Sequence, residues 1–198
     1  MINVLSRPFD RQVDTLVSLG PSDDGTALRS ALATARVEPE PERSVLTPAR
    51  SLIPLATSAA RVTRNGRALV LGHLTLDELE TFEPIASVRV PAAVAYVAVD
   101  VDLGAGSRNV RPEDALTGIL AAGRSPLTID EGVALLLQQP TAIEPNWGFS
   151  MAGSRRADQR VPAFWVSEGR PKLGWCWDRN PHTWLGTASC AGRIAGAA

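Results

Sequence analysis

The sequence predicts an α+β protein with N-terminal helices, a mixed sheet with two capped helices, and a C-terminal antiparallel meander rich in tryptophan. Three observations predict this class. Helical periodicity fills the first 37 residues, two capping-box sequences open short helices further along, and short β-like runs occupy the last quarter. All five tryptophans fall between Trp147 and Trp184, within that last quarter.

The N-terminal segment, residues 1–37, is predicted to be helical. Phe9 to Leu19 places its apolar side chains on one helical stripe, and Thr26 to Val37 repeats this spacing. The stretch 38–43 is rich in glutamate and proline and cannot hold a helix. It is expected to link the helical segment to an α+β domain at 44–198, with both parts in one compact unit.

The centre of the chain is predicted to supply the mixed sheet. Prolines interrupt Ser44 to Ala60, which favours irregular or edge-strand pieces there. Asn65-Gly66 has the composition of a tight hairpin turn. The nearly continuous apolar run from Ala92 to Val101 predicts a strand that is covered on both faces.

The sequence also predicts where helices begin in this part of the chain. Thr75 with Glu78, and Thr128 with Glu131, have the Thr-x-x-Glu spacing of a capping box. Between them, Pro112 suits the first position of a helix that runs to about Ala122.

The last quarter is predicted to be an antiparallel meander. Its expected strands are Phe149–Ala152, Val161–Ser167 and Lys172–Trp177. Because side chains alternate along a strand, Trp165 occupies one face of its strand, while Trp175 and Trp177 share a face of theirs. If the two faces coincide, three indoles line one side of the sheet.

Bulk properties restrict the partners. The formal net charge is -1 with no basic stripe, so nucleic acid is not expected as a partner. No apolar run approaches the ~20 residues that span a bilayer, and the first residues lack a secretory signal. We therefore expect a cytoplasmic protein with no membrane partner and with its two cysteines reduced.

The most reactive residue types gather at Cys176, Asp178, His182 and Cys190. Either cysteine with His182 as base, oriented by Asp178 or Asn180, would form a nucleophilic pair. Zinc would accept the two thiolates and the imidazole, but the spacing matches no standard finger. We predict no cofactor and no metal, and buried thiols acting as small apolar groups remain the structural alternative.

The same region predicts an aromatic-walled pocket for a small molecule or peptide. Its expected ligand-binding residues are Trp165, Trp175, Trp177, Asn180, His182, Trp184 and Arg155. Two alternatives stay open. One is an enzyme that depends on cysteine and histidine; the other is a protein-interaction module with exposed indoles, of which a homodimer is one form.

Several phrases of the chain carry a resemblance. They are PLTIDEGVALL from Pro126, GSRRADQRVPAFW from Gly153, and PKLGWCWDRNPHTWLGTAS from Pro171. Together they resemble an uncharacterised actinobacterial family of unknown function, over most of the chain. The resemblance implies a shared fold and assigns no reaction.

Overall fold

The computed structural model describes residues 4–18 and 25–196. Its α-helices are α1 (Phe9–Val17), α2 (Thr26–Ala33), α3 (Leu55–Arg61), α4 (Leu76–Leu79), α5 (Pro112–Ala121) and α6 (Ile129–Gln138). Short 3-10 helices are η1 (Ala105–Ser107) and η2 (Pro140–Ala142).

The strands form two larger sheets and several two-stranded pairs. They are β1 (Val45–Pro48), β2 (Thr63–Arg64), β3 (Arg67–Ala68), β4 (Val70–Leu71), β5 (Glu83–Pro84), β6 (Ala95–Val99), β7 (Ser125–Pro126), β8 (Gly148–Ser150), β9 (Ser154–Arg155), β10 (Arg160–Ser167), β11 (Arg170–Trp177), β12 (Leu185–Thr187), β13 (Ser189–Cys190) and β14 (Gly192–Ile194). The larger sheets have the orders β1-β6-β14 and β12-β8-β10-β11-β4. The predicted α+β class is confirmed.

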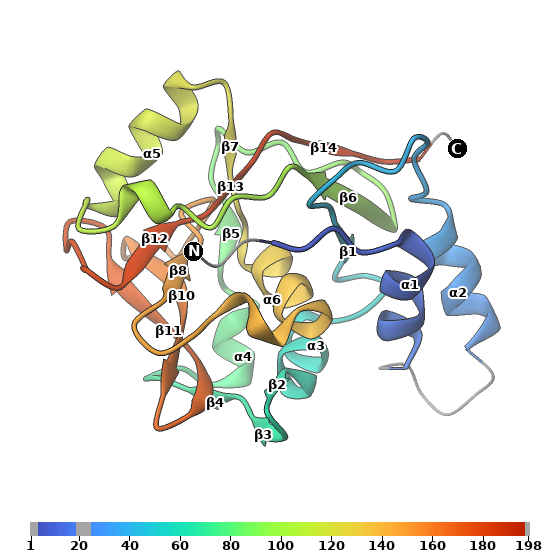
Figure 1. Cartoon of the computed structure of the whole chain (residues 1–198), viewed down its shortest axis with the longest axis horizontal. Helices are drawn as coiled ribbons and strands as arrows, with labels where there is room; N and C mark the ends of the chain where they lie inside the picture. The colour runs from blue at the N-terminus through green and yellow to red at the C-terminus, as the bar shows by residue number, and fades with distance from the viewer. Residues whose placement is uncertain (1–3, 19–24, 197–198) are drawn as a thin grey trace.

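Helix α6 lies between the two larger sheets (Figure 1). It is buried almost all round because its sequence is apolar on every side, which is typical of a helix inside a core. Gly132 lets α6 pack closely against β8 and the residue that follows it: a Cβ there would lie 2.0 Å from Sδ of Met151 and 3.4 Å from the Phe149 ring. On its other side, Glu131 of α6 is fully buried and accepts a hydrogen bond of 2.8 Å from Arg193 of β14.

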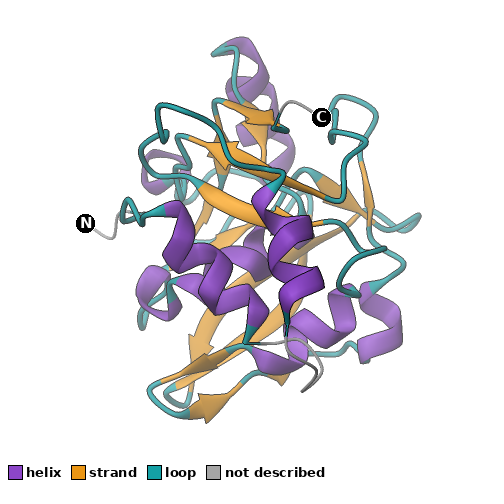
Figure 2. Ribbon diagram, turned by 90° about the vertical axis from the view of Figure 1, so that its right-hand side faces the viewer, coloured by secondary structure: helices purple, strands orange, loops and turns teal. Residues whose placement is uncertain are grey.

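Helices α1 and α2 cover the outside of the three-stranded sheet. Figure 2, seen from their side, shows helices in front of the strands. Phe9, Val13 and Leu16 of α1 join Leu46 of β1 and Val97 of β6 in one apolar cluster. Gln12 fixes the contact, since its side chain accepts a 2.8 Å hydrogen bond from the backbone N–H of Leu46.

Several local predictions are confirmed. Thr75 and Thr128 both form complete capping boxes, at α4 and α6. Asn65 and Gly66 both have positive φ, 51° and 72°, and join β2 to β3 as a tight hairpin turn. Pro112 begins α5.

The prediction for Ser44 to Ala60 was wrong in part. Residues 45–48 do form an edge strand, β1, but α3 occupies much of the remainder. Pro54 precedes this helix rather than interrupting it, and proline is tolerated at a helix start because the first N–H groups have no intrahelical partner.

The antiparallel meander is confirmed in β8, β10 and β11. Its edges were not foreseen, because β4 joins β11 in parallel and β12 joins β8 in parallel. Short strands such as these give little periodic signal in the sequence.

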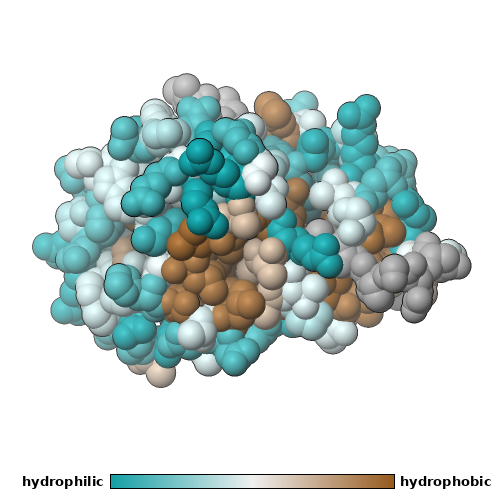
Figure 3. All heavy atoms as spheres, turned by 90° about the horizontal axis from the view of Figure 1, so that it is seen from below, coloured by the Kyte–Doolittle hydropathy of each residue, from teal (hydrophilic) through white to brown (hydrophobic). Residues whose placement is uncertain are grey.

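Seen from below, apolar residues gather in a hollowed patch at the end of the molecule that carries β2, β3 and β4 (Figure 3). Leu69, Leu71 and Val166 are only partly buried against the main core. Within residues 4–18 and 25–196, no helix has the length and apolar character to cross a membrane.

Candidate functional site

The pairing of β10 with β11 separates the indoles onto two faces. Trp165 lies opposite Lys172, whereas Trp175 lies opposite Pro162 and Trp177 opposite Arg160. Directly opposed residues share a face and neighbours along a strand alternate. The three indoles therefore do not line one side, and that expectation was wrong.

We call the face with Trp165, Lys172, Gly174 and Cys176 the outer face. The inner face carries Phe164 and Leu173, which belong to the main core with residues of α6. Trp175 packs against the edge of this core.

Trp165 lies across β11 and β4 on the outer face. A Cβ on Gly174 would come within 2.5 Å of Cη2 of Trp165, and one on Gly72 within 3.6 Å. The indole can therefore pack this closely against β11 because Gly174 lacks a side chain. A Cβ on Gly72 would make only an ordinary contact with the ring and would instead lie 2.8 Å from Cε of Lys172. Gly174 thus creates the seat for this ring.

Two further rings extend the aromatic row that begins at Trp165. The Trp165 and Trp184 ring centroids are 5.6 Å apart in an edge-on arrangement, and His182 lies 5.2 Å from Trp184. All three side chains are half-buried. The two indoles cover a small apolar cluster, which consists of Ala152, Val161, Ala163, Cys176 and Leu185.

Lys172 supplies the charge beside this aromatic row. Its Nζ lies 5.7 Å from the centroid of Trp165, within the range of a cation–π contact. Among the described residues, no carboxylate lies within ion-pair distance of it. Lys172 is the only lysine of the chain, and it was not among the site residues expected from the sequence.

Arg155 and Asp178 meet near Cys176. Arg155 Nη2 lies 3.6 Å from Asp178 Oδ2, and both side chains are more than four-fifths buried. Arg155 also donates to the carbonyl of Ala152 at 2.6 Å. Burial lowers the pKa of Arg155, partly offset by the charge of Asp178. The pair is thus internally neutralised rather than presented to a ligand.

The two thiols lie in different apolar clusters. Cys176 belongs to the cluster below the outer indoles and Cys190 to the main core. Burial raises the pKa of Cys176 to about 12 and that of Cys190 to about 11, so both are protonated at neutral pH. Burial also lowers the pKa of His182.

The predicted cysteine–histidine chemistry has little support in this geometry. Among the described residues no hydrogen bond joins His182 to a thiol, and His182 instead accepts from the Asn109 N–H, at 2.9 Å, through its backbone carbonyl. Over the same residues, no group of three or more His, Cys, Asp or Glu side chains is placed to hold a metal. Asn180 is exposed on the turn after β11.

The inner face ends in a stacked group that sequence reasoning did not foresee. Arg160 Cζ lies 4.4 Å from the Trp175 ring centroid and 5.9 Å from that of Trp177. Arg160 Nε is also 3.1 Å from Asp158. Trp177 is 45% exposed, beyond the end of the core.

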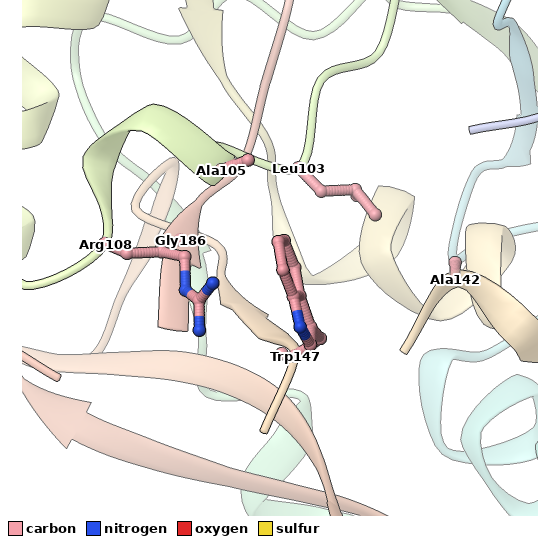
Figure 4. A pocket seen from close by; sticks show the side chains of 7 residues that line it. Leu103, Ala105, Arg108, Ala142, Trp147 and Gly186 are labelled. Carbon is pink, nitrogen blue, oxygen red and sulfur yellow. The ribbon is translucent and has the colours of Figure 1, made fainter. Parts of the chain in front are cut away.

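Trp147 occupies a separate position, beside β12. Figure 4 shows its ring between the Arg108 guanidinium on one side and Leu103 and Ala142 on the other. Arg108 Cζ is 4.0 Å from the ring centroid, and Arg108 Nε donates to the Thr183 carbonyl at 2.9 Å. The cavity here is about 10 Å³, room for a single water.

Comparison with known proteins places the chain by family alone. Neither the curated proteins nor the solved structures contain a match. A model described as a family of unknown function, DUF5701, matches residues 13–196. This match spans most of the chain, and the protein therefore belongs to the DUF5701 family of unknown function.

Proposed function

We propose that the protein binds a small molecule or a peptide through the outer face of the β10–β11 hairpin. The observation that carries this function is the packing of Trp165 against Gly174, beside a Lys172 that has no ion-pair partner among the described residues. A half-buried indole packed against the backbone offers a firm surface on which another flat group can stack.

The surroundings of Trp165 define what would stack there. Trp184 stands edge-on at one side and limits the ligand in that direction. Lys172 adds a positive charge that has no counter-ion within the described part of the chain, so a negatively charged group on the ligand would gain an ion pair. The favoured ligand is planar and anionic, either a small aromatic acid or a peptide segment with an aromatic and an acidic side chain.

An enzyme that uses a cysteine nucleophile is supported less well. Nucleophilic attack needs the thiolate, and the pKa values of about 12 and about 11 keep both thiols protonated. Asp178 is already paired with Arg155, so it does not orient His182.

Binding of 2-naphthoate, followed by titration calorimetry, tests the proposed function. The neutral 2-naphthylmethanol and the cationic 2-naphthylmethylammonium serve as matched probes of the same ring. We expect 2-naphthoate to bind best of the three. Trp165→Leu should weaken it about tenfold, since an aromatic pair contributes ~0.5–1.5 kcal/mol beyond burial.

Trp177→Leu is the matched control, because it removes an indole from the opposite face of the same strand pair. It should leave the affinity for 2-naphthoate within about twofold. Equal loss in both variants, or no binding of any of the three probes, would contradict ligand binding at the outer face.

Exposure of Trp177 favours one second function, a protein interface on the inner face. Trp and Arg dominate binding hot spots, and Trp177 lies exposed with Arg160 stacked nearby. Sedimentation velocity of the wild type and Trp177→Ser tests the homodimer form. Concentration-dependent association that Trp177→Ser abolishes would support it, and a monomer at all concentrations would contradict it.

A further inference from the structure

A second cavity lies away from the meander, where β1, β5, β6 and the start of α6 meet. Its volume is about 230 Å³, and its lining residues are Pro48, Ala49, Arg50, Glu83, Pro84, Val90, Tyr96 and Asp130. It shares none of these residues with the outer face. The volume is somewhat below the ~300–1,000 Å³ of pockets for drug-sized ligands, so a smaller molecule would fit.

The positive group of this cavity, Arg50, has most of its N–H donors occupied. Nε and Nη2 donate to the two oxygens of Asp130 at 2.7 and 2.9 Å. Nη2 also donates to the Phe82 carbonyl at 2.7 Å, and Nη1 to the Glu80 carbonyl at 3.0 Å. A guanidinium fixed in this way has little capacity left for an anionic ligand.

Carboxylates outnumber this single cation. Besides Asp130, Glu80 Oε2 lies 3.5 Å and Glu83 Oε1 lies 4.0 Å from Arg50 Nη1. The Glu83 side chain is 74% exposed, so it can turn towards a ligand at the mouth. One arginine and three carboxylates therefore surround the cavity, and their summed charge is negative.

The remaining wall is apolar and aromatic. Pro48, Pro84 and Val90 line it together with Tyr96, which is almost fully buried. An aromatic ring and aliphatic walls favour the apolar part of a ligand, and a tyrosine ring also attracts a cation.

We propose that this cavity binds a small organic ammonium ion, with the ammonium group at Glu83, beside the Arg50–Asp130 pair, and the apolar group against Tyr96 and Val90. The volume of this open cavity carries the inference, and the excess of carboxylates over Arg50 gives the sign of the charge. The site is independent of the function proposed for the outer face.

Tyr96 provides a selective reporter, because it is the only tyrosine of the chain. Labelling with 3-fluorotyrosine gives one ¹⁹F resonance, at the wall of the cavity. Titration with benzylammonium chloride should shift this resonance saturably. Benzyl alcohol should bind several-fold more weakly, and benzoate should leave the resonance unchanged.

Two variants test the contacts. Glu83→Gln removes an exposed carboxylate and should weaken benzylammonium binding about threefold, the size expected for a partly solvated ion pair. Val90→Trp places a large ring at an exposed wall position and should abolish the shift by filling the cavity. Glu144→Gln, an exposed carboxylate that does not line the cavity, is the control and should bind as the wild type does.

The outcomes separate the two sites. A saturable shift with benzylammonium that Val90→Trp removes supports the cavity site, whatever 2-naphthoate does at the outer face. Equal shifts of the Tyr96 resonance with benzylammonium, benzyl alcohol and benzoate would overturn the preference for a positively charged ligand. No shift with benzylammonium at millimolar concentration would overturn the site itself.

Discussion

The two faces of the β10–β11 hairpin carry the same kinds of residue in different settings. Each has indoles with a cation stacked against them: Lys172 on Trp165 outside, and Arg160 on Trp175 and Trp177 inside. The inner indoles continue a core that α6 covers, and Arg160 has Asp158 as its partner. The outer Lys172 has no carboxylate partner among the described residues.

The difference shows that composition alone does not identify a binding face. Inside, the aromatic side chains extend a packed interior, and their cation is already neutralised. Outside, Gly174 seats an indole on the backbone, and the neighbouring Lys172 has no carboxylate partner among the described residues. The function proposed for the outer face therefore depends on seating and charge pairing, which the number of tryptophans does not reveal.

Core packing gives the largest expected contrast between the faces. Phe164→Ala removes a fully buried inner ring and should lower the free energy of unfolding by ~3–5 kcal/mol. Trp165→Ala removes a half-buried outer ring next to it in sequence and should lower it by only ~1–2 kcal/mol. Chemical denaturation of both variants measures this, and equal losses would contradict the division into a core face and a solvent-facing one.

Gly174, against which the Trp165 ring packs, gives the next largest expected effect on stability. Gly174→Ala places a Cβ 2.5 Å from Trp165 Cη2, so the indole must move and the free energy of unfolding should fall by ~2 kcal/mol. Gly118→Ala is the matched control on α5, where a new Cβ meets nothing within 4 Å and should stabilise by ~0.5–1 kcal/mol. If Gly174→Ala were as stable as the wild type, the ring would not be seated on that residue.

Alkaline pH tests whether the layer beneath the outer indoles is dry. Burial raises the pKa of Cys176 from 9.0 to about 12, so the folded state holds the thiol proton more tightly than the unfolded state. The corresponding stability is complete below pH 9 and is lost as the pH rises towards 12, by ~1 kcal/mol at pH 10.

Thermal unfolding between pH 8 and pH 10 measures this loss. The wild type should lose more stability over this pH interval than Cys176→Ala does. The comparison is between the two pH slopes, so the absolute stability of the variant does not matter. Identical pH slopes would mean that the thiol is hydrated and that water reaches below the indoles.

Lys172→Gln should have the smallest effect on folding. Its ammonium group has no ion-pair partner among the described residues, so the free energy of unfolding should change by less than ~0.5 kcal/mol. The discrimination between 2-naphthoate and 2-naphthylmethanol should disappear, as calorimetry would show. Retained discrimination would assign the charge preference to another group.

Much of the local structure followed from the sequence. The capping boxes at Thr75 and Thr128 and the Asn65-Gly66 turn involve residues a few positions apart, so short-range chemistry decides them. Helix α3 was missed because the prolines of its region suggested strands. The parallel edges β4 and β12 depend on contacts distant in sequence, which periodicity does not report.

The candidate site could be predicted only in part. Trp165, Trp184 and His182 do lie together, but Trp175 and Trp177 lie on the other face because of the register of β10 against β11. A register shift of one residue would reverse this, and a single sequence does not fix it. The sequence shows Gly174 next to Trp175, but it does not show that Gly174 packs under Trp165, because that contact depends on how β10 pairs with β11.

The most direct test is the ¹⁹F spectrum of protein labelled with 5-fluorotryptophan, which has one resonance for each of the five indoles. Single Trp→Phe variants assign the resonances before 2-naphthoate is added. We expect saturable shifts of Trp165 and Trp184 while Trp175 and Trp177 remain unchanged. Shifts confined to Trp175 and Trp177, or no shifts at all, would contradict a ligand surface on the outer face.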